Sequence, residues 1–427
     1  MLPESVARTG DAARDEAEAV RRCRFCRAPL TESFADLGMT PPANAYLRSE
    51  ELSRMEPFYP LHAYVCGGCL LVQLDAFQTP DEIFGDYAYF SSYSETWLDH
   101  AARFATQAIE RFDLNTDSQV LEIASNDGYL LQYFQRRGVP VLGVEPAANV
   151  AAVAAAKGIP TLVRFFGVET ARALATRGQQ ADLLIANNVL AHVPDINDFV
   201  AGLAVALKPS GALSLEFPHL LQLMRNVQFD TIYHEHFSYL SLQAVERVLA
   251  AHGLVVADAE TLPTHGGSLR VIARHRAAPG PIGQRVAGLR AREREAGLAD
   301  LATYRGFAER VKAVKRELLG FLIEAKTAGK SIVGYGAAAK GNTLLNYCGV
   351  GSDFLDYVVD ASPHKQGRFL PGTHIPIHHP DRIRATRPDY LLILPWNLER
   401  EIMARMAHIR EWGGQFVLPI PTVRVEP

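Results

Sequence analysis

The sequence VLEIASNDG, residues 120–128, decides the fold class. Its apolar first half predicts a buried strand, and its polar second half predicts a turn into a helix that begins near Tyr129. A second strand over Val139–Val144 ends at Glu145, 23 residues after Glu122. This is the span of one strand–helix–strand unit whose second strand presents a carboxylate to a ribose. The stretch therefore predicts an α/β domain that binds an adenosine-containing cofactor.

Further apolar segments extend this pattern along the chain. Two more strands are expected over Asp182–Ala186 and Ala212–Phe217, and the first of them runs into Asn187 and Asn188. Four strands with helices between them predict a doubly wound, Rossmann-like sheet, whose ligands gather at the carboxyl ends of the strands. We assign this domain to residues 81–285.

The glycine pattern favours one cofactor over another. A dinucleotide needs G-x-G-x-x-G for its pyrophosphate, whereas the loop after the first strand contains only Gly128. An acidic, polar loop suits the ammonium and carboxylate groups of S-adenosylmethionine, with Glu145 on the ribose hydroxyls. An ordinary turn and a solvated strand end are the alternatives. The candidate cofactor-binding residues are Glu122, Ala124, Asn126, Asp127, Gly128, Glu145 and Asn187.

Four of the five cysteines form two C-x-x-C pairs, Cys23 with Cys26 and Cys66 with Cys69. Two such pairs complete a closed tetrahedral Cys₄ site, so we expect a structural zinc ion. The 39 residues between the pairs must bring them together. We place this zinc-binding domain at residues 21–80, after a loose lead-in over residues 1–20. Buried free thiols or a redox dithiol are the alternatives.

The composition is that of a soluble globular enzyme. A formal net charge of −4, from 43 basic and 47 acidic residues, provides no basic field for nucleic acid or an anionic membrane. No apolar run reaches the ~20 residues of a membrane span, and the N-terminus lacks the apolar core of a secretion signal. We expect a cytoplasmic monomer with a small-molecule substrate and neither a nucleic-acid nor a membrane partner.

A second α/β unit begins at SIVGYG, residues 331–336. Gly334 and Gly336 match two of the three glycines of a dinucleotide fingerprint, and Asp360 follows 24 residues after Gly336. The generic motif indicates NAD. The same loop, with Lys340 near the start of the helix, can equally hold the diphosphate of a nucleotide sugar.

The segment YHEHFSYLS, residues 233–241, is dense in groups that can move protons. Ser241 is a candidate N-cap for the helical pattern that follows, so the motif lies in loop or extended backbone before a helix. A surface loop is the alternative. The segment THGGS, residues 264–268, could be a turn or a substrate loop, and the sequence does not separate the two.

The cysteine pairs, EIASNDG, YHEHFSYLS and GYGAAAKGNTLLNY occur in this order over residues 20–420. Together they resemble the sugar C-methyltransferases of deoxysugar biosynthesis. The resemblance implies a zinc-binding domain, a central S-adenosylmethionine domain, and a C-terminal Rossmann-like domain, residues 286–427, that binds a nucleotide-linked keto-sugar. It implies methylation at C3 of a 4-keto deoxysugar, with a dTDP-sugar as the expected substrate.

Matched position by position, the resemblance implies that His236 is the catalytic base. Tyr233 and Glu235 lie in the same motif, and His192 and Tyr87 match further active-site positions. A histidine can deprotonate the carbon beside a ketone. A carboxylate such as Glu235 could orient an imidazole. Tyrosine hydroxyl groups or His192 could donate hydrogen bonds to the enolate oxygen. The expected substrate-binding residues are Tyr335, Gly336, Lys340 and Asn342.

Two other functions compete with this interpretation. One is an NAD-dependent sugar oxidoreductase that uses the GYGAAAK loop and Asp360. The other is a zinc-ribbon nucleic-acid methyltransferase or binding module, against which the net negative charge argues.

Overall fold

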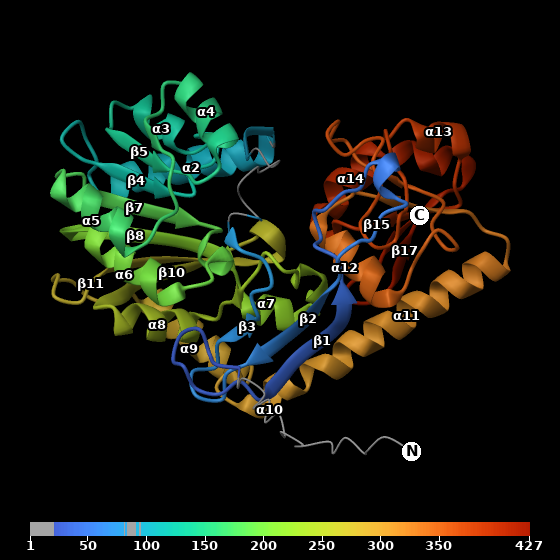
Figure 1. Cartoon of the computed structure of the whole chain (residues 1–427), viewed down its shortest axis with the longest axis horizontal. Coiled ribbons are helices and arrows are strands. Elements are labelled where there is room, and N and C mark those ends of the chain that lie inside the picture. Colours follow the sequence, from blue (N-terminus) through green and yellow to red (C-terminus); the bar gives the residue numbers. More distant parts are fainter. Residues whose placement is uncertain (1–20, 81, 83–90, 94) are drawn as a thin grey trace, which may run out of the picture.

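The computed structural model describes residues 21–427 except 81, 83–90 and 94. Tyr87 therefore lies outside the described residues. Two large lobes lie on either side of a small antiparallel sheet, and the long helix α11 (Phe307–Thr327) runs below that sheet from one lobe to the other (Figure 1). Within the described ranges, no helix combines the length and apolar character needed to cross a bilayer.

The small sheet has four strands in the order β1-β2-β3-β9. Its strands are β1 (Glu32–Thr40), β2 (Tyr59–Val65), β3 (Val72–Leu74) and β9 (Ser238–Tyr239). The fourth strand comes from far along the chain, directly after the YHEH motif, and pairs antiparallel with β3. The zinc-binding part of the chain and the proposed catalytic motif therefore share one sheet.

The first lobe is built on a seven-stranded sheet in the order β10-β11-β8-β7-β4-β5-β6. The strands β4 to β8 run parallel, and β11 runs antiparallel to both β8 and β10. Their bounds are β4 (Val120–Ile123), β5 (Val141–Val144), β6 (Thr161–Leu162), β7 (Ala181–Asn187), β8 (Leu207–Pro218), β10 (Leu254–Leu262) and β11 (Ser268–His275). The four-strand expectation was therefore too small, although the doubly wound class is confirmed.

Both faces of this sheet are buried, as expected of parallel strands. In β7, Leu183 and Ile185 enter the core formed with α2 and α3, whereas Leu184 and Ala186 enter the core formed with α6 and α8. The covering helices are α2 (Glu95–Arg111), α3 (Leu131–Gln135), α4 (Ala148–Ala156), α5 (Val168–Thr176), α6 (Ile196–Ala206), α8 (Leu242–Ala251) and α9 (Gln284–Glu295). Helix α7 (Leu220–Arg225) instead packs in the central core with the small sheet and α11. Ser241 caps α8 as predicted, since its Oγ accepts the Ala244 N–H at 3.2 Å.

The second lobe has a six-stranded sheet in the order β14-β13-β12-β15-β16-β17, parallel except for β17. Its strands are β12 (Ile332–Tyr335), β13 (Val358–Val359), β14 (Ile377–His378), β15 (Tyr390–Ile393), β16 (Gln415–Leu418) and β17 (Arg424–Glu426). The helices α10 (Leu301–Arg305), α12 (Ala339–Cys348), α13 (Arg382–Thr386) and α14 (Glu399–Arg405) complete this part of the chain.

Each parallel sheet has one point where the strand order reverses. It lies between β4 and β7 in the first lobe and between β12 and β15 in the second. Ligands of open α/β sheets bind in the crevice at the carboxyl ends of the strands beside such a point. The fold therefore has two candidate ligand edges.

Candidate active site

The loop after β4 has an unusual backbone. Ala124 and Asn126 have φ values of 54° and 50°, and Gly128 has 76°. Residues other than glycine seldom adopt positive φ, and such conformations cluster at ligand sites. The Glu145 carboxylate supports the loop by accepting the N–H of Asn126 and of Ala147, both at 2.9 Å. Glu145 is thus a buried strand end, and the solvated alternative is wrong.

Unsatisfied polar atoms surround this loop. Among the described residues, the buried atoms without a hydrogen-bond partner include Glu122 Oε2, Ser125 Oγ, Asp127 Oδ1, Asn187 Oδ1 and Asn188 Oδ1. Burial raises the pKa of Glu122 well above its ordinary value, and the nearby carboxylates of Glu145 and Asp127 raise it further. Buried groups of this kind indicate a polar ligand, and these acceptors suit the ammonium and hydroxyl groups of S-adenosylmethionine. The expected cofactor residues are brought together at one edge.

Two imidazoles meet next to this edge. His192 follows β7 in the short helix η3 (Leu190–His192), and its ring centroid lies 4.7 Å from that of His236. The Tyr233 ring lies 4.0 Å from His236 on another side. Both histidines are partly accessible although protein surrounds them. Lys340 and His265 lie close enough to lower the pKa of His236, and we call the space among these four side chains the cleft. Burial lowers the pKa of His192 to about 4 and that of His236 well below its ordinary value.

The orientation of His236 corrects one expectation. Its Nδ1 donates to the Thr231 carbonyl oxygen at 2.8 Å, which leaves Nε2 with the basic lone pair. The Glu235 carboxylate instead accepts the Asn44 Nδ2 at 2.6 Å. A backbone carbonyl therefore orients the imidazole, and Glu235 ties the motif to the N-terminal part of the chain.

Lys340 approaches the same cleft from the second lobe. It lies in the first turn of α12, where its Nζ donates to Asn397 Oδ1 at 2.6 Å and sits 4.7 Å from the centre of the Trp396 ring. Trp396 follows β15, and its Nε1 donates to Asp230 Oδ2 at 2.7 Å. These contacts bring the carboxyl edge of the second parallel sheet to the residues just before the YHEH motif.

The other expected substrate residues have mainly structural contacts in the second lobe. The Tyr335 ring is buried in the hydrophobic core with Val359 and Phe416, so it is a core residue. Gly336 has a φ of 92°, and a Cβ there would meet Pro395 at 2.5 Å. Asn342 is buried, and its Nδ2 donates to the Ala43 carbonyl oxygen at 2.6 Å. Asn342 therefore joins the N-terminal part of the chain to the second lobe.

Sequence reasoning missed or left open further residues of the cleft. His265, in the THGGS segment, has a φ of 53°, and its ring centroid lies 5.2 Å from that of Trp97. Solvent reaches its side chain, yet burial by surrounding protein lowers its pKa to about 4, and Lys340 lowers it further. Gly266 of the same segment lines a cavity together with Trp396 and Asn397, so THGGS is a cavity-lining loop. Asn44, which binds Glu235, and Tyr46, whose hydroxyl group donates to the Ala337 carbonyl oxygen, were also missed because no motif surrounds them.

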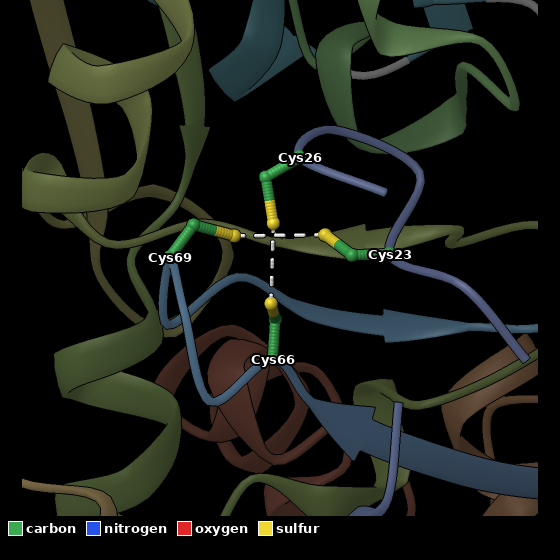
Figure 2. A group of neighbouring side chains, drawn as sticks. All are labelled: Cys23, Cys26, Cys66 and Cys69. Carbon is green, nitrogen blue, oxygen red and sulfur yellow. Dashed lines mark hydrogen bonds between the residues drawn. The ribbon is translucent and has the colours of Figure 1, made fainter. Parts of the chain in front are cut away.

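The four paired cysteines converge on one centre. Their sulfur atoms all lie within 4.8 Å of one another, with Cys23–Cys69 at 3.5 Å and Cys26–Cys66 at 3.4 Å. A tetrahedral zinc site with bonds of about 2.3 Å has sulfur–sulfur edges of about 3.8 Å, so the donor set fits zinc. Figure 2 shows the side chains pointing inward from two separate turns.

Family models cover most of the chain. A zinc binding domain matches residues 23–84, a methyltransferase domain matches residues 97–259, and a C-methyltransferase C-terminal domain matches residues 263–421. These matches fit the four-cysteine centre and the doubly wound sheet. None of them supports the oxidoreductase alternative.

Three individual comparisons differ in how much of the chain they cover. The C-methyltransferase NovU of Streptomyces niveus is 38% identical over 414 residues, which cover 96% of this chain and 98% of NovU. The ubiquinone biosynthesis O-methyltransferase of Chelativorans sp. (strain BNC1) is 29% identical over 33% of this chain and 60% of that protein. The solved magnesium protoporphyrin IX methyltransferase of Synechocystis PCC 6803 is 17% identical and covers 45% of this chain and 88% of its own, with a TM-score of 0.32.

The expected fold class, methyltransferase activity and cofactors are confirmed. The chain belongs to the C-methyltransferase family, uses S-adenosylmethionine as its methyl donor and holds zinc at its four N-terminal cysteines.

Proposed function

We propose that this C-methyltransferase acts at C3 of a nucleotide-linked 4-keto deoxysugar, with a dTDP-sugar as its substrate. The observation that carries the proposal is the neutral His192–His236 pair, in which His192 follows β7 at the carboxyl edge of the first sheet and His236 is close enough to Lys340 for that cation to lower the pKa of His236. Carbon becomes nucleophilic only after it loses a proton, and a neighbouring ketone makes that proton removable. The imidazole pair supplies a base next to the position where we propose that this carbon binds.

His236 is the proposed base. With Nδ1 held by the Thr231 carbonyl, the Nε2 lone pair takes the proton from C3, and the C–H electron pair becomes the enolate. S-adenosylmethionine, when bound, would supply an electrophilic methyl group to C3, and the electron pair of its methyl–sulfur bond would leave on the sulfur of S-adenosylhomocysteine. Tyr233 flanks His236 and is the proposed hydrogen-bond donor to the enolate oxygen. His192, whose N–H binds the Glu235 backbone carbonyl, is proposed to line the site beside the base. Tyr87 is proposed as a further active-site residue from the family resemblance alone.

Lys340 is the proposed anchor for the nucleotide. Burial lowers the pKa of its ammonium group, while Asp230 opposes that shift. A partly desolvated cation beside a helix start and an aromatic ring suits a diphosphate group. The nucleotide would then lie along the edge of the second lobe, with its sugar at the histidines.

Mass spectrometry of reactions with a panel of thymidine and guanosine diphosphate keto-sugars tests the proposed function. We expect a product heavier by one CH₂ group with a dTDP-linked 4-keto deoxysugar, and NMR should place the new methyl group at C3. A new methyl group on oxygen, or at C5, would contradict the proposal.

The substitution His236→Asn tests the base. We expect kcat to fall at least about 100-fold while the S-adenosylmethionine Kd changes less than about twofold, because only the proton-transfer step loses its base. His234→Asn is the matched control, since the His234 ring faces Tyr59 and Phe77 on the N-terminal side. Equal loss of cofactor affinity in His236→Asn would defeat the assignment.

The pH dependence of kcat/KM tests the protonation state of the free enzyme. Because burial lowers the pKa of His236 and sets that of His192 at about 4, the imidazoles stay neutral well below the ordinary value of about 6.5. Activity falls only when the base becomes protonated, so the acid limb should lie clearly below pH 6.5. A limb at or above pH 6.5 would mean that His236 is not the titrating base.

Substitution of one zinc ligand tests the role of the metal. A closed Cys₄ site contributes to folding and leaves no position for substrate, so Cys66→Ser should lower bound zinc and thermal stability together. Cys348→Ser, at a buried cysteine outside the cluster, should keep one zinc per chain. Unchanged stability in metal-free Cys66→Ser would show that zinc does not support the fold.

A further inference from the structure

Arg24 lies inside the first zinc-binding turn, between Cys23 and Cys26. Its side chain reaches two backbone carbonyls outside that turn. Nη1 donates to the Pro194 oxygen at 2.7 Å, and Nη2 donates to the Leu74 oxygen. One guanidinium group therefore bridges two segments that are far apart in the sequence.

Both bridged segments lead directly to the imidazole pair. Pro194 comes two residues after His192. The Leu74 N–H donates to the Phe237 carbonyl oxygen at 3.1 Å, and Phe237 directly follows His236. The centre of the Arg24 guanidinium also lies 5.3 Å from the centre of the Phe237 ring. The cation thus contacts the segments next to both histidines.

The backbone of Arg24 is itself held by the zinc site. Its N–H donates to Gln73 Oε1 at 2.8 Å, and Gln73 Nε2 donates to the Cys23 sulfur at 3.2 Å. On the other side, Asn197 Nδ2 donates to the carbonyl oxygens of Arg24 and Phe25 at 3.2 and 2.9 Å. The backbone of Arg24 is therefore held in place from two sides, by Gln73 and by Asn197.

Burial of the Arg24 guanidinium group is unfavourable, because the positive charge loses its hydration. The guanidinium group nevertheless remains charged near neutral pH. The side chain donates to two carbonyl oxygens, and the rigid planar guanidinium group matches this arrangement better than the compact ammonium group of a lysine. The arrangement indicates that Arg24 holds two backbone carbonyl groups in a fixed relative position and does not act through its charge alone.

We propose that Arg24 is a positioning residue that couples the zinc turn to the His192–His236 pair and maintains the 4.7 Å separation of the two rings. The inference rests on the proposed function, because it assumes that this pair performs the proton transfer. Arg24 does not touch the reacting atoms in this role. It acts through the backbone on either side of them.

Arg24→Lys and Arg24→Gln test the proposal, with Arg27→Gln, at an exposed position of the same turn, as the matched control. We expect kcat to fall at least about tenfold in both Arg24 variants, since small displacements of catalytic groups are costly. The sugar KM, the S-adenosylmethionine Kd and the content of one zinc per chain should stay within about twofold. A merely structural role would instead lower zinc content, cofactor affinity and kcat together.

Hydrogen–deuterium exchange provides a readout that does not depend on the reaction. Peptides covering residues 190–195 and 231–240 should exchange faster in both Arg24 variants than in the wild type or Arg27→Gln. A folded, zinc-loaded Arg24 variant with wild-type kcat, or with unchanged exchange in both peptides, would overturn the proposal. If Arg24→Gln fails to fold, the Lys variant decides. If the wild type methylates no keto-sugar, the proposed function fails, while the exchange data still test the bridge.

Discussion

Residues 228–241 are hydrogen-bonded to the small sheet and to elements of both lobes, and the rest of the site depends on this constraint. The Phe237 carbonyl accepts from the end of β3, the Ile232 carbonyl accepts from Thr343 of α12, and the Leu240 carbonyl accepts from Leu220 of α7. Asp230 adds the side-chain bond to Trp396. A segment fixed from three directions has little freedom to move, so its side chains keep a defined place between the two lobes.

Desolvation sets the chemistry at this junction. A histidine can act as a base only while it is neutral, and burial keeps His192 and His236 neutral by making the charged form unfavourable. The neighbouring carboxyl group of Glu235 has its pKa raised for the same reason. Limited contact with water therefore keeps the proton acceptor His236 neutral. The Thr231 carbonyl selects the tautomer that leaves Nε2 unprotonated.

The sequence predicted the local features well and the long-range partners poorly. Gly128 and the spacing from Glu122 to Glu145 predicted the cofactor edge, because these residues lie within one strand–helix–strand unit. The cysteine pairs likewise predicted their own cluster. Strand β9 could not be foreseen, since two residues carry no periodicity and their partner strand lies more than 160 residues earlier. The bond from Asn44 to Glu235 joins segments that have no common motif, so pattern analysis placed Glu235 against an imidazole instead.

The four cysteines of the zinc centre differ in exposure. Cys23, Cys66 and Cys69 are buried, whereas Cys26 is exposed at one corner of the cluster. Thiolates react with electrophiles and oxidants according to their accessibility. Chemical attack on this centre should therefore begin at Cys26, and a modified sulfur there would leave the metal with three ligands. Oxidation of the exposed Cys26 sulfur would in this way disturb the three buried cysteines, because all four share one metal ion.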